Sequence, residues 1–337
     1  MDNKTPDSIA QTVANTIQTN VRALFGKIQK STPAVRQINI YPIKSCAEIQ
    51  VASATVTSRG FQNDRIFQVV SKVDGAWHYC TPREKAFEKL FHIKTILSDD
   101  GKCLTLSSPH ASDTFTLKLK DAPTTSLTTT VMGGEEVSLE DYGNDVAEWL
   151  SNATGIDTDP RLVGIAHDNF HRCVEVNPDQ GEELPTPSPI PLSLADEAPF
   201  LLTTQESLSD LKLKLKSAGK DAVDMRRFRP NIIIDGLEPW EEDSLKRIKI
   251  GTIEFHVWQR CGRCTMTTVD RDTLKRCGEP LSTLSSFRER KGQRNFGMHL
   301  IPVVGSDEGV ISVGDEVEIL EYDDERRAEW MRLFGKQ

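Results

Sequence analysis

The feature that most limits the fold of this chain is a succession of short apolar segments that alternate with polar residues and end in turn signals. In the first half they occupy residues 35–41, 51–57, 66–70, 77–81 and 93–97. Alternation with a period of two is typical of β-strands, and Asp74-Gly75 between two such segments predicts a hairpin. So many short strands favour a barrel or a sandwich.

The second half shows the same pattern with more helix. A strand at 198–204 runs into a helix ending near Ser217, with Thr204 as the N-cap. Further strands are expected at 232–235, 248–250, 253–258, 265–269, 310–313 and 316–320, with Gly314-Asp315 as a hairpin turn. With helices expected at 141–151 and 323–333, the predicted fold class is α+β and β-rich.

Five prolines between 177 and 191 predict a linker with little regular structure. We therefore expect two domains, at residues 33–185 and 186–322, with an N-terminal extension at 1–32 and a charged C-terminal helix at 323–337. Residues 8–29 have the apolar spacing of an amphipathic helix. This helix is expected to pack on its own domain, and the alternative is a membrane-surface helix or an organelle presequence.

Composition limits the kinds of partner and the cellular compartment that we expect. The net charge of −9 argues against nucleic-acid binding, which favours a basic face. Seven cysteines do not form an obvious disulfide framework and indicate a reducing compartment. No apolar run approaches the roughly 20 residues that a transmembrane segment needs. The sequence predicts a soluble intracellular protein, cytoplasmic in preference to one associated with mitochondria or a membrane surface through residues 8–29.

The chemistry of the chain centres on Cys261-Gly-Arg-Cys264, flanked by Arg260 and Arg263, which should favour the thiolate form. Half of a zinc site, a redox dithiol and one ligating thiolate beside a structural cysteine are the three interpretations. A zinc site would need a second pair of ligands. A redox dithiol should precede a helix, whereas residues 265–269 predict a strand. These arguments favour the single ligating thiolate.

Two basic motifs predict an anion pocket. Arg229-Pro-Asn231 leads directly into the apolar strand 232–235, and Arg is the preferred partner of phosphate and carboxylate groups. Lys44-Ser45, in the turn after the first strand, supplies an amine, a hydroxyl and backbone N–H groups. The alternative for Lys44 is a solvated loop lysine, and for the arginines it is a surface cluster paired with some of the 50 acidic residues. Beside a thiolate, they suggest a metal held mainly by a phosphorylated organic cofactor.

Several short motifs, taken in order, resemble those of the MOSC proteins, and within them the amidoxime-reducing components of mitochondria and their bacterial relatives. The resemblance covers about residues 35–320. The motifs are Tyr41-Pro-Ile-Lys-Ser-Cys46, Asp64-Arg65, Thr81-Pro-Arg83, Ala198-Pro-Phe200, Arg229-Pro-Asn231, Cys261-Gly-Arg-Cys264 with Thr268-Val-Asp270, Phe296-Gly297 and Val313-Gly-Asp315.

The resemblance implies a β-barrel-like MOSC N-terminal domain followed by a MOSC β-barrel domain with peripheral helices, and a molybdenum–molybdopterin cofactor between them. It assigns Cys264 as the molybdenum ligand and catalytic residue, and leaves Cys261 a structural role. The family often has Ser where this chain has Gly262, so backbone contacts are expected there. The implied cofactor-binding residues are Lys44, Ser45, Arg65, Asp196, Arg229, Asn231, Gly262 and Arg263.

The implied function is molybdenum-dependent reduction of N-hydroxylated substrates, such as amidoximes and hydroxylamines, to the N–H compound. No iron–sulfur cysteine cluster follows Cys264, so a separate protein must donate electrons. The expected donor is a cytochrome b5-type haem protein with its NADH reductase, or an iron–sulfur protein. The alternative is a molybdenum-cofactor carrier or a sulfurase-type MOSC module without reductase activity. Full sulfurases add a desulfurase domain that uses pyridoxal phosphate, for which 337 residues leave no room.

Overall fold

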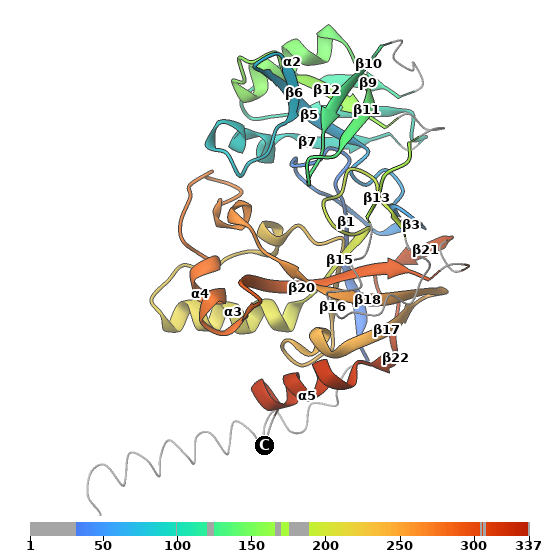
Figure 1. Cartoon of the computed structure of the whole chain (residues 1–337), viewed down its shortest axis with the longest axis vertical. Helices are drawn as coiled ribbons and strands as arrows, with labels where there is room; N and C mark the ends of the chain where they lie inside the picture. The colour runs from blue at the N-terminus through green and yellow to red at the C-terminus, as the bar shows by residue number, and fades with distance from the viewer. Residues whose placement is uncertain are drawn as a thin grey trace, which may run out of the picture.

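The computed structural model describes residues 32–98, 100–119, 125–165, 170–174, 189–303, 305 and 308–335 (Figure 1). The helix predicted at 8–29 and most of the proline-rich stretch lie outside these ranges. Within them, no helix has the length and apolar character needed to cross a membrane. The described chain forms an upper and a lower half in the view of Figure 1, each with its own apolar core.

The lower half is built on a large sheet in which β15 and β16 pair in parallel and the other neighbours pair antiparallel. Its order is β2 (Ile49–Val51), β1 (Ala34–Ile40), β16 (Ile232–Asp235), β15 (Phe200–Thr204), β20 (Gln293–Pro302), β18 (Ile253–Gly262), β17 (Leu245–Ile250) and β22 (Val317–Tyr322), with β19 (Glu289–Arg290) beside β20. An isolated bridge joins Ala34 to Glu316, so the sheet curves back toward its own early strand β1.

Period-two patterning explains how this sheet packs. β18 buries Ile253, Phe255 and Val257, and the same core takes in side chains from β1, β15, β16 and β20. Phe200 packs edge-on against Phe255, with 5.5 Å between ring centroids. The strand β1 therefore pairs with β16, which lies more than 190 residues later in the chain, a long-range pairing that no local pattern reveals.

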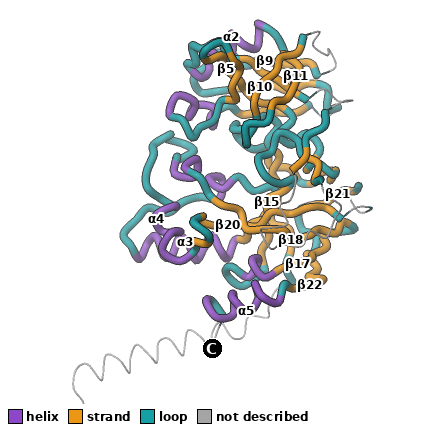
Figure 2. Tube along the Cα trace, in the orientation of Figure 1, coloured by secondary structure: helices purple, strands orange, loops and turns teal. Residues whose placement is uncertain are grey.

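Helices cover one side of these strands, as the purple segments of Figure 2 show. Thr204 caps α3 as predicted, because its hydroxyl oxygen accepts a hydrogen bond from the Ser207 N–H at 3.1 Å. The α-helices are α3 (Gln205–Ser217), α4 (Leu281–Phe287) and α5 (Asp324–Leu333), and the 3₁₀ helices are η3 (Met225–Phe228), η4 (Glu241–Ser244) and η5 (Thr265–Thr268).

The upper half combines a five-stranded and a three-stranded antiparallel sheet with one α-helix. The larger sheet has the order β10 (Ser126–Thr130), β11 (Glu136–Asp141), β12 (Arg161–Gly164), β5 (Phe67–Val73) and β6 (Ala76–Tyr79). The smaller has β7 (Lys94–Leu97), β8 (Cys103–Ser107) and β9 (Phe115–Lys118), and the helices are α2 (Asn144–Thr154) and η1 (Lys85–His92). Short pieces complete the chain: β3 (Ser53–Thr57), β4 (Gly60–Phe61) and β21 (Gly309–Ser312) pair together, as do β13 (Cys173–Val174) and β14 (Ile190–Pro191). The prediction of a β-rich α+β fold is confirmed.

The strand predicted at residues 265–269 is wrong. Residues Thr265–Thr268 form the 3₁₀ helix η5, although three of the four are threonines with a preference for strands. The hydroxyl of Thr267 donates to the Cys264 carbonyl at 2.9 Å, and that of Thr268 donates to the Thr265 carbonyl at 2.7 Å. These bonds to carbonyls three residues back support a tight turn in place of an extended strand.

The hairpin predicted at Gly314-Asp315 is also wrong. Gly314 has a φ of 94°, and the Asp315 carboxylate accepts a hydrogen bond from the Ser312 N–H at 2.8 Å, so the chain does turn there. The strands on either side do not pair with each other, however. β21 pairs with β3 and β22 pairs with β17, so the turn passes the chain from one sheet to another.

A buried carboxyl group in η4 makes the stability of this half depend on pH. Glu242 accepts hydrogen bonds from the hydroxyls of Ser207 at 2.8 Å and Thr204 at 3.3 Å. Burial and the adjacent Asp243 carboxylate raise the pKa of Glu242 to about 7. Because the folded-state pKa is the higher one, its contribution to stability is fully present below about pH 4.5 and is lost as the pH rises to about 7.

We expect Glu242→Gln to remove this dependence. Relative to the wild type, the free energy of unfolding of the variant should rise by about 3 kcal/mol between pH 4.5 and pH 8, measured by urea titration at both pH values. Glu318→Gln, at an exposed position on β22, is the control and should retain the wild-type pH dependence. A difference between Glu242→Gln and wild type that stays constant with pH would contradict the prediction.

Candidate functional site

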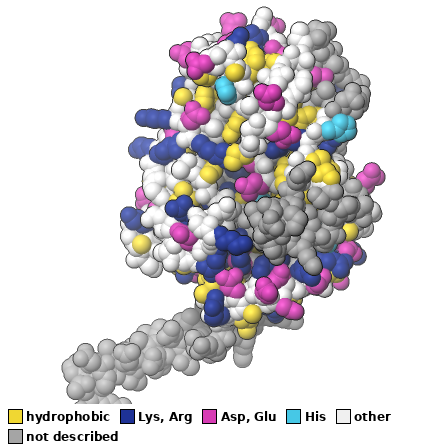
Figure 3. Space-filling view, in the orientation of Figure 1, with side chains coloured by type: hydrophobic (Ala, Val, Ile, Leu, Met, Phe, Trp, Pro, Cys, Tyr) yellow, Lys and Arg dark blue, Asp and Glu magenta, His cyan; other side chains and the backbone are white. Residues whose placement is uncertain are grey.

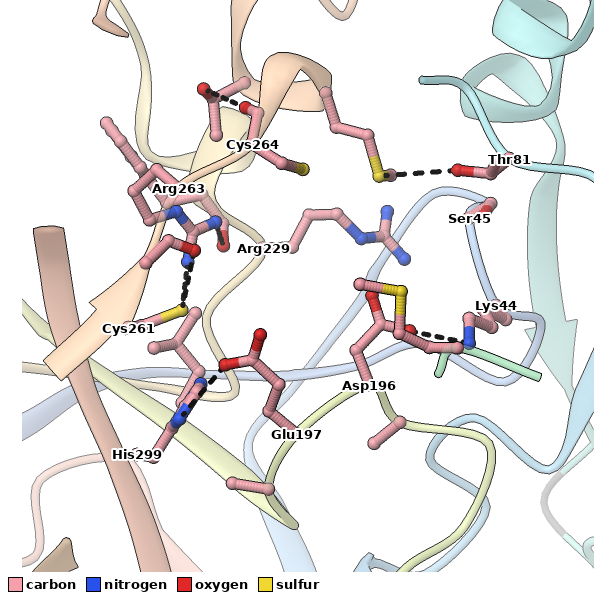
Figure 4. Close-up of a pocket in the computed structure, with 18 of the residues that line it drawn as sticks. Lys44, Ser45, Thr81, Asp196, Glu197, Arg229, Cys261, Arg263, Cys264 and His299 are labelled. Carbon is pink, nitrogen blue, oxygen red and sulfur yellow. Dashed lines mark hydrogen bonds and ion pairs between the residues drawn. The ribbon is translucent and has the colours of Figure 1, made fainter. Parts of the chain in front are cut away.

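The nine residues predicted to ligate a metal or bind a cofactor all line one cavity of about 330 Å³ (Figure 4). The upper half contributes Tyr79, Thr81, Arg83 and Met132 to its wall, and the lower half contributes the ends of β15, β18 and β20 and the segment after η3. The cavity therefore lies where the two halves meet. Motifs that are more than 200 residues apart in sequence, such as Lys44-Ser45 and Cys261-Gly-Arg-Cys264, face the same space.

Cys264 lies just beyond the end of β18 and is the residue before η5. Its thiol accepts a hydrogen bond from Nε of Arg83, at 3.5 Å, so a side chain from the upper half holds the sulfur. The sequence analysis placed Arg83 in the Thr81-Pro-Arg83 motif but not among the site residues. Taken alone, an arginine after a strand carries no sign of the thiol 181 residues away that it contacts.

Of the two arginines expected to stabilise the thiolates, Arg263 contacts the Cys261 thiol and Arg260 contacts neither thiol. Arg260 does not line the cavity, and it donates hydrogen bonds to Asp243 at 2.9 Å and Glu329 at 2.8 Å. Arg263 lines the cavity but donates to the sulfur of Cys261 at 2.7 Å. Arg260 and Cys261 are neighbours in β18, where successive side chains point to opposite faces of the sheet, so Arg260 points away from the Cys261 thiol.

The two cysteines are unlike in surroundings. Cys261 is buried, and burial raises the pKa of its thiol although Arg263 acts in the opposite direction. Figure 4 shows the two sulfurs on different sides of the Arg263 backbone. A helical turn, η5, follows Cys264, so the expected strand does not speak against a redox dithiol. The two thiols still differ, because Arg83 contacts Cys264 and Arg263 contacts Cys261.

Asp196 links two cations on the cavity wall. One of its carboxylate oxygens lies 2.6 Å from Nζ of Lys44, and the other lies 3.3 Å from Nη2 of Arg83. Burial alone would raise the pKa of Asp196, but the charges of Lys44, Arg83 and Arg65 outweigh it and hold that pKa below its ordinary value. Asp196 is therefore ionised at neutral pH. The next residue along from Lys44 is Ser45, whose φ of 72° places it in the left-handed region at the cavity edge.

Arg65 and Arg229 lie against the ring of Tyr41, with their guanidinium carbons 4.6 and 4.3 Å from its centroid. Arg65 is paired with Asp64. Arg229 donates to the Cys46 carbonyl at 2.5 Å and, among the described residues, has no carboxylate within ion-pair distance. Burial, helped by the charge of Arg65, lowers the pKa of Arg229. A cation that lines a cavity and has no carboxylate partner there favours an anionic ligand.

Asn231 lines the cavity, but its amide is already used within the protein. Its Oδ1 accepts from Arg65 at 3.1 Å and from the Leu201 N–H at 3.2 Å, and its Nδ2 donates to the Asn39 carbonyl at 3.3 Å. The amide of Asn231 therefore fixes the direction of Arg65. Gly262 is covered by the side chain of Gln293, since an added Cβ would come within 2.5 Å of Oε1 of Gln293.

The lining of the cavity carries an excess of positive charge, although the whole chain has a net charge of −9. Figure 3 shows Lys and Arg side chains gathered along the edge where the upper half meets the lower half. A confined positive field raises the local concentration of anions. Its charged members are Lys44, Arg65, Arg83, Arg227, Arg229, Arg263 and Arg294 against Asp196 and Glu197.

Glu197 and His299 also line the cavity and were not among the predicted site residues. Glu197 follows Asp196 directly, and this adjacency was the only available signal. His299 lies on β20, where its neighbours in sequence are mostly apolar, and the sequence pattern does not show that its side chain lines a cavity.

Comparison with known proteins agrees with these motifs. Residues 32–157 match the MOSC N-terminal beta barrel domain, and residues 189–318 match the MOSC domain. The mitochondrial amidoxime-reducing component 1 of Homo sapiens is 31% identical over 305 residues, which are 87% of this chain and 85% of that protein. The Mus musculus protein of the same name is 32% identical over 298 residues, 85% and 82% of the two chains.

The molybdenum cofactor sulfurase of Oryza sativa subsp. japonica is 30% identical over 273 residues, 79% of this chain. The match takes up 32% of that protein, so this chain corresponds to about a third of its length. The amidoxime-reducing components, in contrast, match over most of their length. From its two domain matches and these relatives, the chain belongs to the family of MOSC-domain proteins that includes the mitochondrial amidoxime-reducing components.

Proposed function

We propose that this protein is a molybdenum-cofactor-dependent reductase of N-hydroxylated substrates, such as amidoximes and hydroxylamines, with Cys264 as the metal ligand. The observation that carries the proposal is that Arg83 holds the Cys264 thiol in a cavity that also holds Arg229, a cation with no carboxylate partner among the described residues. Relatives that match over most of their length are named amidoxime-reducing components.

The residues of the cavity suit a phosphorylated organic cofactor. Arg229 and Lys44 would hold the phosphate, since both present cationic groups to the cavity. Arg65, with its direction fixed by Asn231, would contact the same ligand. The thiol of Cys264 is a soft donor of the kind that suits a transition metal. When bound, the cofactor would supply the electron pair that reduces the N–O bond.

The remaining groups would orient the reactants. Arg83 holds the sulfur of Cys264 with one nitrogen and Asp196 with another, so it sets the position of the thiol relative to the rest of the wall. The sulfur of Met132 accepts a hydrogen bond from Nη1 of Arg83 at 3.0 Å, which further fixes the direction of the guanidinium group. The electrons would come from a separate protein, for which a cytochrome b5-type haem protein with its NADH reductase, or an iron–sulfur protein, is the candidate.

A second candidate is a cofactor carrier or sulfurase-type module without reductase activity, which the match to molybdenum cofactor sulfurases favours. One experiment separates the two. Protein produced in cells that make the cofactor is assayed for molybdenum and molybdopterin, and then for anaerobic reduction of benzamidoxime with a reduced viologen as donor. We expect stoichiometric metal and turnover. Stoichiometric metal without turnover would support the carrier, and the lack of both would contradict both proposals.

The phosphate assignment predicts a loss of anion binding in Arg229→Gln. Removing a charge-assisted hydrogen bond of about 1.5–3 kcal/mol should weaken binding of inorganic phosphate, measured by calorimetry on cofactor-free protein, by roughly 10- to 100-fold. Arg226→Gln is the matched control, since Arg226 lies nearby in η3 but is about a third exposed and pairs with Asp224 and Asp272. Equal phosphate affinities for both variants would contradict the assignment.

A further inference from the structure

We propose that Glu197 delivers a proton to the oxygen that leaves the substrate, and that His299 positions the Glu197 carboxyl group for this step. The inference rests on the proposed reductase function and names a proton source for it. The supporting geometry is the Glu197 carboxyl group, which lines the cavity and is partly exposed to solvent, with the buried imidazole of His299 beneath it.

The chemistry requires such a group. Reduction of an N–OH compound to N–H and water takes up two electrons and two protons, because the N–O bond breaks, one proton joins the leaving OH group to form water, and the other forms the new N–H bond. The electrons come from the separate donor protein of the proposed function. The protons must reach the cavity from bulk water, and a hydroxide leaving group without a proton donor would be a poor one.

The other acidic and basic groups of the wall do not suit this task. Asp196 is held ionised between Lys44 and Arg83, and its pKa is lowered by their charges, so it does not carry a proton at neutral pH. Arginines keep their protons at any physiological pH. Glu197 differs because its side chain is 46% exposed, and among the described residues it contacts no Lys or Arg within ion-pair distance.

His299 lies under this carboxyl group on β20. Its Nδ1 is 3.8 Å from Oε2 of Glu197 and 3.4 Å from Nε2 of Gln259, and its side chain is buried. Figure 4 shows the Glu197 carboxyl group above the imidazole and turned toward the open part of the cavity. At 3.8 Å the contact is longer than a hydrogen bond, so His299 positions Glu197 by lying directly beneath its carboxyl group and limiting the directions that it can take.

The charges around the imidazole favour its neutral form. Burial lowers the pKa of His299 to about 4, and Arg263 and Arg65 act in the same direction, whereas Glu197 and Asp196 act against them. The ring of Trp258 packs at a centroid distance of 6.4 Å. A neutral His299 therefore places no positive charge against the Glu197 carboxyl group near pH 7.

The test compares Glu197→Gln, Glu197→Asp and wild type in viologen-driven benzamidoxime reduction, with kcat normalised to molybdenum content. Loss of a general acid predicts a fall of about 100-fold in kcat for Glu197→Gln. The Asp variant should recover a large part of it. Glu289→Gln is the matched control, with a side chain 47% exposed on β19 and outside the cavity lining.

A second measurement does not need the loaded enzyme. In cofactor-free protein, NMR titration of His299 should show a lower pKa in Glu197→Gln than in wild type, because the Glu197 charge raises it. An unchanged His299 titration, or a Glu197→Gln variant with wild-type kcat and pH profile, would overturn the proposal. Absence of turnover in the wild type would instead refute the reductase function itself, and the proton step with it.

Discussion

Replacing Cys264 with alanine is expected to remove molybdenum from the purified protein and to lower kcat for benzamidoxime by more than about 100-fold, the range in which outer-shell partners of metal ligands already act. The reason is that Cys264 is the thiol that Arg83 holds within the cationic cavity, and no second thiol shares its hydrogen bond. Metal content by mass spectrometry and steady-state kinetics give the two readouts.

Cys261→Ala is the matched control, three residues away on the same segment. Its thiol is buried and bound to Arg263, so we expect the metal to stay and the protein to lose about 1–2 kcal/mol of stability through the unsatisfied arginine and the small cavity. Full metal retention in Cys264→Ala would refute the ligand assignment. Metal loss in both variants would show that the pair acts together, against the asymmetry that the structure indicates.

Asp243→Ala is expected to destabilise the protein by about 3–5 kcal/mol, the effect of removing one partner from a buried ion pair. Asp243 is buried and receives two hydrogen bonds from Arg288, at 2.7 and 2.8 Å, and one from Arg260 at 2.9 Å. Both cations would be left without this carboxylate inside the fold. Because Arg260 lies on β18, four residues before Cys264, the same change should also loosen the strand that presents the thiol.

Urea unfolding measures this effect, with the m-value checked for constancy. Glu321→Ala is the control, since Glu321 pairs with Lys246 on the surface, where the side chains are 39% and 48% exposed. Removing that surface ion pair should cost under about 1 kcal/mol. A loss for Asp243→Ala no larger than that for Glu321→Ala would mean that the buried network around η4 contributes little net stability.

Local patterns predicted much of the fold because strand alternation and helix capping act over a few residues. The alternating segments at 35–41 and 253–258 are found as β1 and β18, and the Thr204 cap begins α3. The wrong predictions also come from relying on local patterns alone. The threonines after Cys264 favour a strand by propensity, but their hydroxyl groups bond back to carbonyls and form η5.

The sequence by itself determined the strand and turn pattern of this protein and the motifs that gather at its cavity, since residue types and their spacing express both. Only the tertiary structure decided which side chains meet there. The contact of Arg83 with Cys264 and the placing of Glu197 beside His299 each bring distant segments together, and no carboxylate of the described residues pairs with Arg229. Such contacts follow from how β1, β15, β18 and β20 assemble in one sheet, and periodicity within a segment carries no information on its distant partners.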